Sequence, residues 1–261
     1  MLYSRFILPS SHARAHVAVT DRWGGFSSTP FGSLNLALHV GDDDTVVAAN
    51  RGILANTLGL APEGLRFIDQ VHGNRVIAWD ADGAYEPLTG ERTESLRADA
   101  HVTTTPGLGL VVMVADCVPV MFADPEVGVI GVAHAGRAGM VDGVVSATVE
   151  AMRKLGASHI KVAIGPSICP RCYEVPGDMR AQVSSIEPVT ASVSRDGTPA
   201  LDVAAGVAEQ AVRAGCEIVD FSSACTREST DLFSYRKDSV TGRFGALVWL
   251  EELTTHPLKD A

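Results

Sequence analysis

The sequence has 261 residues, enough to bury a substantial core, and its 46% hydrophobic and 20% charged content is that of an ordinary globular protein. A formal net charge of −10, from 21 Lys and Arg against 31 Asp and Glu, argues against nucleic-acid or anionic-membrane partners. The N-terminus does not fit a signal peptide, and the longest apolar run, residues 107–115, is too short for a membrane span. Five cysteines are too few for a disulfide scaffold, so we expect a protein of the reducing cytoplasm.

Several segments are near-continuous runs of apolar, often β-branched residues, which is typical of strands covered on both faces. Strands are expected at residues 16–21, 65–70, 75–79, 109–116, 118–124, 128–134, 159–165, 216–221 and 244–250. Helical periodicity predicts helices over residues 44–60, 139–156 and 200–216, with Asp202 as a cap of the last one. Residues 80–100 are polar and rich in turn formers, which indicates a long loop. Because strands and helices do not alternate strictly, the pattern favours one α/β domain over residues 1–261 with a mixed sheet.

The first group of reactive side chains surrounds residues 118–134. A hairpin of residues 109–116 and 118–124, continued through a turn into 128–134, would bring His134 within reach of Cys117. His72 lies at the tip of a second expected hairpin, between residues 65–70 and 75–79. Together they form a His₂Cys set, the ligand number of a catalytic zinc with an open fourth position.

Two simpler interpretations of these residues stay open. A lone cysteine is more often a small buried hydrophobe, and a histidine at a turn is usually only solvated. Cys117 and His134 could also be the nucleophile and base of a cysteine hydrolase, a chemistry that needs no second histidine such as His72.

The second group is the Cys169–Cys172 pair in "CPRC". No second CxxC follows it, so we expect neither a zinc site nor an obligatory disulfide there, although Cys172 could line the active-site pocket. Arg137 in "HAGRAG" stands at an expected helix start, where a guanidinium suits phosphate; Arg243 is the next candidate. No general acid can be assigned from the sequence: Asp116, beside Cys117, has the right chemistry, but adjacent residues of a strand would face opposite sides.

Six blocks of sequence together resemble one known family, the YfiH or laccase-domain family. They run in family order from about residue 16 to 250: "DRWGGFSSTPFGSLNLALHVGDDDTVVAANR", "DQVHGNRV", "ADAHVTTTPGLGLVVMVADCVPVMFAD", "GVAHAGRAG", "AIGPSICPRCYEV" and "CTRESTDLFSYRKDSVTGRFGALVWL". Members were once labelled multicopper polyphenol oxidases and are now regarded as purine nucleoside phosphorylases. This chain departs from the pattern at "TDR", where "TTR" is more usual, and at "RKDSVTGR", where a Gly-rich stretch often precedes "TGR".

The resemblance implies a single-domain, layered α/β/β/α fold with mixed sheets. It also implies that His72, Cys117 and His134 bind zinc, with copper as the alternative metal, and that the substrates are phosphate and a purine nucleoside: adenosine, inosine or 5′-methylthioadenosine. Adenosine deamination would accompany phosphorolysis. Cys117 and His134 are then catalytic residues as well as ligands, and Arg137 joins them as the phosphate contact on its anion chemistry alone. We expect the protein to be monomeric.

Other functions remain as alternatives. They are the cysteine hydrolase, a peptidoglycan-precursor editing factor, a copper-dependent polyphenol oxidase, and a binding protein whose metal is structural. A multicopper oxidase is the least favoured on physical grounds, because electron delivery to oxygen needs further copper centres and the sequence has no HxH pairs.

Overall fold

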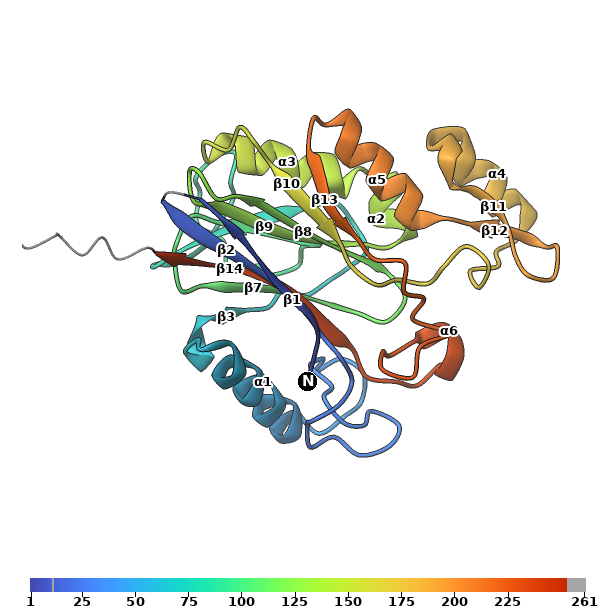
Figure 1. Ribbon diagram of the computed structural model, residues 1–261, viewed down its shortest axis with the longest axis horizontal. Helices are drawn as coiled ribbons and strands as arrows, with labels where there is room; N and C mark the ends of the chain where they lie inside the picture. Colours follow the sequence, from blue (N-terminus) through green and yellow to red (C-terminus); the bar gives the residue numbers. More distant parts are fainter. Residues whose placement is uncertain (11, 253–261) are drawn as a thin grey trace, which may run out of the picture.

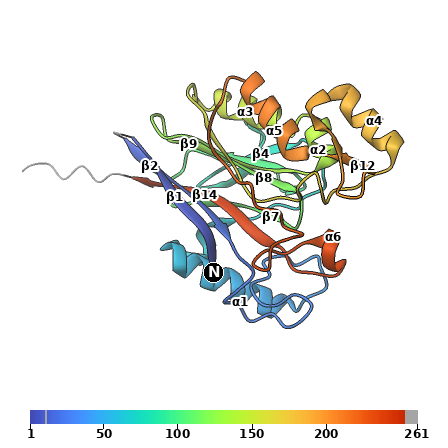
Figure 2. The ribbon, with the colours of Figure 1, turned by 45° about the vertical axis from the view of Figure 1, so that its right-hand side comes forward.

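Two large β-sheets face each other in the structure, a computed structural model that describes residues 1–10 and 12–252 (Figures 1 and 2). The five-stranded sheet has the order β1 (Leu2–Pro9), β2 (Ala13–Thr20), β14 (Phe244–Glu252), β7 (Gly109–Val114), β3 (Leu65–Arg66). The seven-stranded sheet has the order β13 (Glu217–Phe221), β10 (Lys161–Ile164), β8 (Val118–Asp124), β9 (Val129–Ala135), β6 (Ala100–Thr103), β4 (Val76–Asp80), β5 (Gly83–Tyr85). Both are mixed, since β3 with β7, β4 with β6 and β10 with β13 are parallel pairs among antiparallel ones.

Helices cover the outer face of each sheet (Figure 1). Helix α1 (Asp44–Leu58) packs Leu54 against Val111 and Leu247 of the five-stranded sheet. On the seven-stranded sheet, α3 (Val144–Lys154) and α5 (Val203–Arg213) share a core with Phe122. The remaining helices and a small sheet are α2 (Arg137–Val141), α4 (Gly177–Ile186), α6 (Tyr235–Asp238), the short 3₁₀ turns η1 (Pro62–Gly64) and η2 (Pro188–Thr190), and the pair β11 (Ala191–Val193) and β12 (Pro199–Leu201). The layered α/β/β/α prediction with mixed sheets is therefore confirmed.

Strand alternation decides which side chains enter the layer between the sheets. In β9, Ile130 and Val132 pack into this layer, whereas Val129 and Ala133 pack under the helices. His134 has the parity of Ile130 and Val132, so it points into the same layer at the end of its strand. The reactive side chain thus lies where the space between the two sheets opens.

Local sequence signals set the helix ends. The Asp43 carboxylate accepts hydrogen bonds from the N–H groups of Thr45 and Val46 at the start of α1, and Gly59 ends that helix in the left-handed conformation. Asp202 caps α5 as predicted. The single helix expected over residues 139–156 is wrong: Gly143, with φ +84°, separates α2 from α3, because a glycine adopts that backbone at little cost.

The two hairpins expected around the reactive residues are also wrong. Strand β7 belongs to the five-stranded sheet and β8 to the seven-stranded sheet, where β8 pairs with β9 and β10. The chain crosses between the sheets at Asp116, whose φ is +98°. Likewise β3 and β4 lie in different sheets, and His72, with φ +62°, lies on the crossing. Only the β8–β9 hairpin is confirmed.

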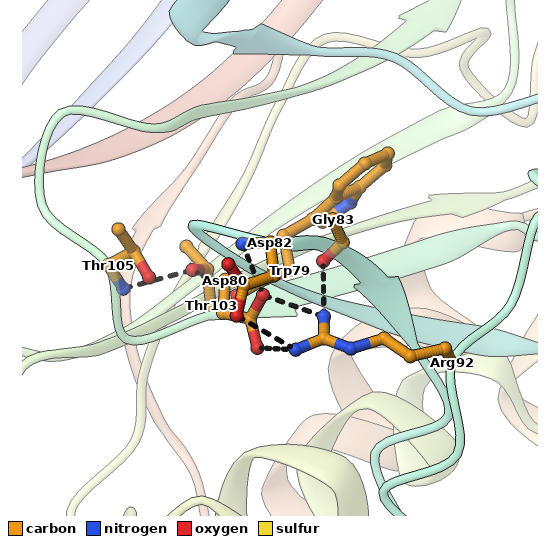
Figure 3. Close-up of polar contacts among 7 residues, drawn as sticks. All are labelled: Trp79, Asp80, Asp82, Gly83, Arg92, Thr103 and Thr105. Carbon is orange, nitrogen blue, oxygen red and sulfur yellow. Dashed lines mark hydrogen bonds and ion pairs between the residues drawn. The ribbon is translucent and has the colours of Figure 1, made fainter.

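Residues 80–100 are a loop as expected, apart from the short strand β5, and they are tied to the sheet edge. Arg92 donates to both carboxylate oxygens of Asp80, at distances of 2.7 and 2.8 Å (Figure 3). In the same view the Thr103 hydroxyl donates to the carbonyl of Trp79, which fastens β6 to β4. The sequence prediction missed β1, β5, β6, β11, β12, α4 and α6.

The single-domain prediction spans residues 1–261, of which residue 11 and residues 253–261 lie outside the described residues. Among the residues that the structure describes, no helix is long and apolar enough to cross a membrane.

Candidate metal centre

Three side chains predicted from the sequence come together between the sheets. His72, Cys117 and His134 each offer one ligand atom, and these atoms lie within 4.8 Å of one another. They come from the β3–β4 crossing, the β7–β8 crossing and the end of β9. The β8–β9 ladder, which pairs Val118 with Ala135 and Pro119 with His134, places Cys117 beside His134. The convergence therefore depends on two chain crossings and one hairpin.

A fourth residue, which sequence reasoning missed, organises this cluster. The carboxylate of Asp99 is fully buried and accepts hydrogen bonds from the N–H groups of Val71 (3.2 Å), His72 (2.8 Å) and Gly73 (2.7 Å). Its Oδ1 also lies 2.8 Å from Nδ1 of His134. Asp99 thus positions both histidines. The available signal was an acidic residue inside the apolar stretch "ADAHV", since a buried carboxylate must have several partners.

The side chains of the cluster shift one another's pKa values. Burial alone would raise the pKa of Cys117, but His134 and His72 outweigh it, and the pKa of the thiol is lowered. Burial alone would lower the pKa of His134, but Cys117 and Asp99 outweigh it, and its pKa is raised. Burial also opposes ionisation of Asp99, yet His134 and the backbone N–H groups of Gly73 and His72 lower its pKa. Without a metal, the site therefore favours a thiolate and an ionised carboxylate around a protonated His134, and a metal bound at Nε2 would displace one of its two ring protons.

These residues fit a metal ion by their donor chemistry. Because Nδ1 of His134 faces Asp99, its Nε2 is the atom left for a ligand bond, an arrangement common in metal sites. The rings of His72 and His134 meet edge to face with centroids 4.7 Å apart. Gly136 keeps the space open, since a Cβ there would lie 3.0 Å from Cys117 Sγ and 3.0 Å from His72 Cδ2. Two imidazoles and one thiolate are a zinc-type donor set.

The cluster lies on a cavity of about 410 Å³ that we call the main cavity. Tyr173 and Tyr235 contribute aromatic rings to its wall, and Arg236 and Arg243 contribute cations. Arg236 is anchored to the carbonyl of Glu174 at 2.7 Å and its guanidinium lies 4.9 Å from the Tyr173 ring centroid. The main cavity thus combines a candidate metal centre with aromatic and cationic surfaces. His39 and Gln70 also line it, and neither was singled out from the sequence.

Arg137 does not line the main cavity. It lines a smaller pocket of about 50 Å³ that shares Asp116, Cys117 and Tyr173 with the main cavity. Burial and Cys117 raise the pKa of Tyr173, although Arg137 and Arg236 beside it act in the opposite direction. Arg137 therefore lines a pocket that adjoins the metal centre at Cys117. Helix α2, which it begins, has only five residues.

Asp116 lines the main cavity beside Cys117, but its carboxylate is held by other groups of the cavity wall. It lies on the β7–β8 crossing and not in a strand, so the strand alternation expected from the sequence does not decide its direction. Its Oδ1 accepts hydrogen bonds from the hydroxyls of Thr226 (2.6 Å) and Ser234 (2.7 Å), and Oδ2 accepts one from the N–H of Arg236 (2.6 Å). A carboxylate that accepts three hydrogen bonds is suited to holding the cavity wall in place. We therefore do not assign Asp116 the role of general acid.

The Cys169–Cys172 pair lies apart from the three ligands. Cys172 does not line the main cavity, contrary to expectation; it lines a neighbouring cavity of about 380 Å³. Cys169 and Cys172 are free thiols, and with Cys225 and Glu228 they form a second cluster of candidate ligands within the described residues. Sequence reasoning missed this cluster because Cys225 and Glu228 are remote from "CPRC" along the chain.

Proteins of known sequence and structure resemble this chain along most of its length. The family model "Multi-copper polyphenol oxidoreductase laccase" matches residues 16–251. Proteins named purine nucleoside phosphorylase from Streptomyces coelicolor and Streptomyces griseus are 48% and 50% identical over 239 residues, which is 91% of this chain and 96% and 95% of theirs.

Two solved structures share the fold. One, described as the hypothetical protein YfiH of Bacillus licheniformis, has a TM-score of 0.81 at 29% identity and covers 94% of this chain and 98% of its own. The other, YlmD from Geobacillus stearothermophilus, has a TM-score of 0.80 at 30% identity and covers 95% of this chain and 100% of its own.

Fold and site together define a mixed α/β protein with a cavity-facing His₂Cys cluster. The chain belongs to the multi-copper polyphenol oxidoreductase laccase family, and its fold is that of YfiH and YlmD. The family assignment made from the six sequence blocks is confirmed.

Proposed function

We propose that this protein is a zinc-dependent purine nucleoside phosphorylase, which transfers the ribosyl group of adenosine, inosine or 5′-methylthioadenosine from the base to phosphate. The observation that carries the proposal is the convergence of His72, Cys117 and His134 on a cavity, in a chain 48–50% identical to proteins named for this activity. Adenosine deamination at the same site, a monomeric state and a cytoplasmic location are parts of the proposal.

The main cavity suits such a substrate. Its volume of about 410 Å³ falls in the range of small-molecule sites, roughly 300–1,000 Å³. Tyr173 and Tyr235 offer ring faces for a purine, and Arg236 and Arg243 balance negative charge. We assign phosphate to Arg137, at the junction of the smaller pocket with the main cavity beside Cys117, with Arg243 as the alternative.

The residues of the site have separate tasks in this mechanism. His72, Cys117 and His134 would hold the metal, and Asp99 keeps the proton of neutral His134 on Nδ1 so that Nε2 is free to bind. A bound zinc ion would supply Lewis acidity, and a water of low pKa for deamination. Arg137 orients phosphate by charge-assisted hydrogen bonds, and the cavity wall excludes water from the ribosyl centre.

A cysteine hydrolase remains the strongest alternative, because the structure arranges Cys117, His134 and Asp99 in the manner of a thiol catalytic triad. The second imidazole separates the two mechanisms. His72 completes a metal ligand set, whereas a thiol nucleophile has no use for it.

The decisive experiment is product identification with purified protein, adenosine and phosphate. Phosphorolysis gives adenine and ribose 1-phosphate and requires phosphate, whereas deamination gives inosine without it. Elemental analysis of the same sample separates zinc from copper, the metal of the polyphenol-oxidase alternative. Chelation should stop both reactions and added zinc should restore them. Full activity after chelation would exclude the zinc mechanism.

A further inference from the structure

The second cluster of candidate ligands joins two distant parts of the chain. Cys169 and Cys172 follow β10, whereas Cys225 and Glu228 follow β13, the parallel neighbour of β10. One ligand atom from each of the four residues lies within 4.8 Å of the others. Cys172 and Cys225 are buried, Cys169 is half-buried, and Glu228 reaches in from the surface.

The two pairs are presented by turns of the same form. In "CPRC" the carbonyl of Cys169 accepts hydrogen bonds from the N–H groups of Cys172 (2.9 Å) and Tyr173 (3.0 Å). In "CTRE" the carbonyl of Cys225 accepts them from Glu228 (3.2 Å) and Ser229 (3.0 Å). Each turn therefore presents its first and fourth side chains on the same side. The x₂ spacing is that of paired ligands in structural zinc sites, with glutamate in place of a fourth cysteine.

The side chains already contact one another as a ligand set would. The Sγ of Cys172 lies 3.1 Å from Oε1 of Glu228, and the Sγ of Cys169 lies 3.8 Å from the same atom. The backbone N–H of Cys169 donates to Sγ of Cys225 at 3.3 Å, which ties the two turns together. In the metal-free protein these thiols donate to the carboxylate; loss of their protons would leave three sulfur atoms and one carboxylate oxygen facing a single point.

Against the expectation from the sequence, we propose that Cys169, Cys172, Cys225 and Glu228 bind a second zinc ion in a closed, four-ligand structural site. Three soft thiolates select zinc over magnesium or calcium, and four protein ligands fill its tetrahedral shell without an open position. Three thiolates, one carboxylate and Zn²⁺ carry a net charge of −2. Arg195, which ion-pairs with Glu228, balances part of it, and Arg171 and Arg227 line the adjacent cavity.

The proposed site joins two segments of the wall of the main cavity. Tyr173, which lines the main cavity, directly follows Cys172. Thr226, which directly follows Cys225, donates to Asp116 through its hydroxyl and to the carbonyl of Ser167 through its N–H. A metal bound across both segments would hold this wall rigid. Its role would be structural. Loss of this metal would loosen the wall of the main cavity, while His72, Cys117 and His134 would all remain in place.

The test is to count metal in matched variants of the full chain. With zinc as the probe, the unmodified protein should bind two equivalents per chain, and Cys225→Ser and Glu228→Gln should each lose one while the His72–Cys117–His134 site keeps its own. Cys216→Ser, a buried free cysteine outside both clusters, should keep two. His72→Ala should lose the other equivalent, which separates this proposal from the proposed function.

Two further measurements do not use variants of the second cluster. Cobalt(II) added to the metal-free protein should give intense thiolate-to-metal charge-transfer bands that persist in His72→Ala, because three thiolates remain. Native alkylation followed by mass spectrometry should find Cys169, Cys172 and Cys225 protected with zinc and labelled after chelation. Metal content unchanged in both Cys225→Ser and Glu228→Gln, alkylation indifferent to chelation, or a Cys169–Cys172 disulfide in protein purified with zinc under reducing conditions would each overturn the second site.

Discussion

Oδ1 of Asp99 lies 2.8 Å from Nδ1 of His134 and accepts the N–H of His72 at the same distance, so one buried carboxylate fixes both histidines of the metal centre. The contact with the His134 ring sets its tautomer, and the backbone contact holds the crossing that carries His72. Removal of the negative charge should therefore affect the whole centre, although Asp99 itself is no ligand.

We expect Asp99→Asn to lower zinc affinity by about 10- to 100-fold. The asparagine NH₂ group would donate to Nδ1 of His134, which moves the ring proton to Nε2 and removes the lone pair needed for the metal. Competition titration with a chromophoric chelator measures the change, and Asp82→Asn, on an exposed carboxylate far from the site, serves as control. Unchanged affinity in Asp99→Asn would show that the tautomer is set by other contacts.

His72→Ala separates the zinc mechanism from the thiol mechanism. We expect loss of most phosphorolysis and deamination and of much of the zinc affinity at this site, because one imidazole and one thiolate hold a catalytic zinc poorly. The proposed Cys117–His134 pair stays intact in this variant, so a cysteine hydrolase would keep its rate. Steady-state rates with and without excess zinc decide the matter, with His159→Ala, an exposed histidine elsewhere, as control.

Arg137→Ala tests the phosphate assignment. The Michaelis constant for phosphate should rise by about 10- to 150-fold, equivalent to about 1.5–3 kcal/mol for a hydrogen bond to a charged group. Deamination of adenosine, which uses no phosphate, should change little. The same kinetics on Arg243→Ala give the comparison: if that variant loses phosphate saturation and Arg137→Ala does not, phosphate binds in the main cavity instead.

His101 provides a prediction about stability and pH. The indole N–H of Trp79 can only donate, so it fixes Nδ1 of His101 as an acceptor (3.1 Å), and Nε2 then donates to the carbonyl of Val111 (3.2 Å). The neutral ring is satisfied, whereas a second proton would face the indole N–H. Burial outweighs the contact with Val111 and lowers the pKa of His101 to about 3.

In the folded state His101 therefore stays neutral at a pH where the same side chain is protonated in the unfolded chain, whose pKa is about 6.5. Stability from His101 is complete above that pH and is lost as the pH falls toward 3. Between pH 7.5 and 5 the unmodified protein should lose about 2 kcal/mol more unfolding free energy than His101→Gln. Urea denaturation at each pH measures the difference, and His159→Gln should keep the unmodified profile. Parallel curves for His101→Gln and the unmodified protein would contradict this account.

The sequence predicted the individual helices and strands better than it predicted which strands pair with each other. Helices α1 and α5 and the strands β8, β9 and β14 followed from periodicity and caps, because those signals are local. The hairpins assigned to β7–β8 and β3–β4 were wrong because local sequence does not show which sheet accepts a strand. At both crossings a residue other than glycine, Asp116 or His72, adopts a positive φ that tertiary contacts stabilise.

The same limit applies to the functional residues. Histidine and cysteine are reactive residue types, which made His72, Cys117 and His134 candidates from the sequence alone. The resemblance to the family then placed the three in one site. The carboxylate of Asp99 binds groups 26 to 35 residues away along the chain, so its role can be recognised only once the fold shows those contacts. Glu228 is an ordinary surface residue until the fold brings it to Cys172.

Gly136→Ala gives the sharpest test of how closely the metal centre is built. The backbone of Gly136, with φ −71° and ψ 173°, is open to alanine, so the substitution strains no dihedral angle. The added Cβ would lie 3.0 Å from both Cys117 Sγ and His72 Cδ2, which must then move apart by tenths of an ångström. Metal–ligand distances in well-formed sites lie within about 0.2 Å of their usual values. We expect zinc affinity to fall at least about 10-fold, in line with other disturbances of ligand position.

The matched control is Gly52→Ala in α1, where nothing lies within 4 Å of the added Cβ. That variant should bind zinc normally and gain about 0.5–1 kcal/mol of stability, because alanine is the better helix former. Zinc titration and thermal denaturation on both variants separate a local effect on the ligands from a general effect on folding. If Gly136→Ala binds zinc as tightly as the unmodified protein, then Cys117 and His72 do not bind one ion across this glycine, and the three-ligand centre must be abandoned.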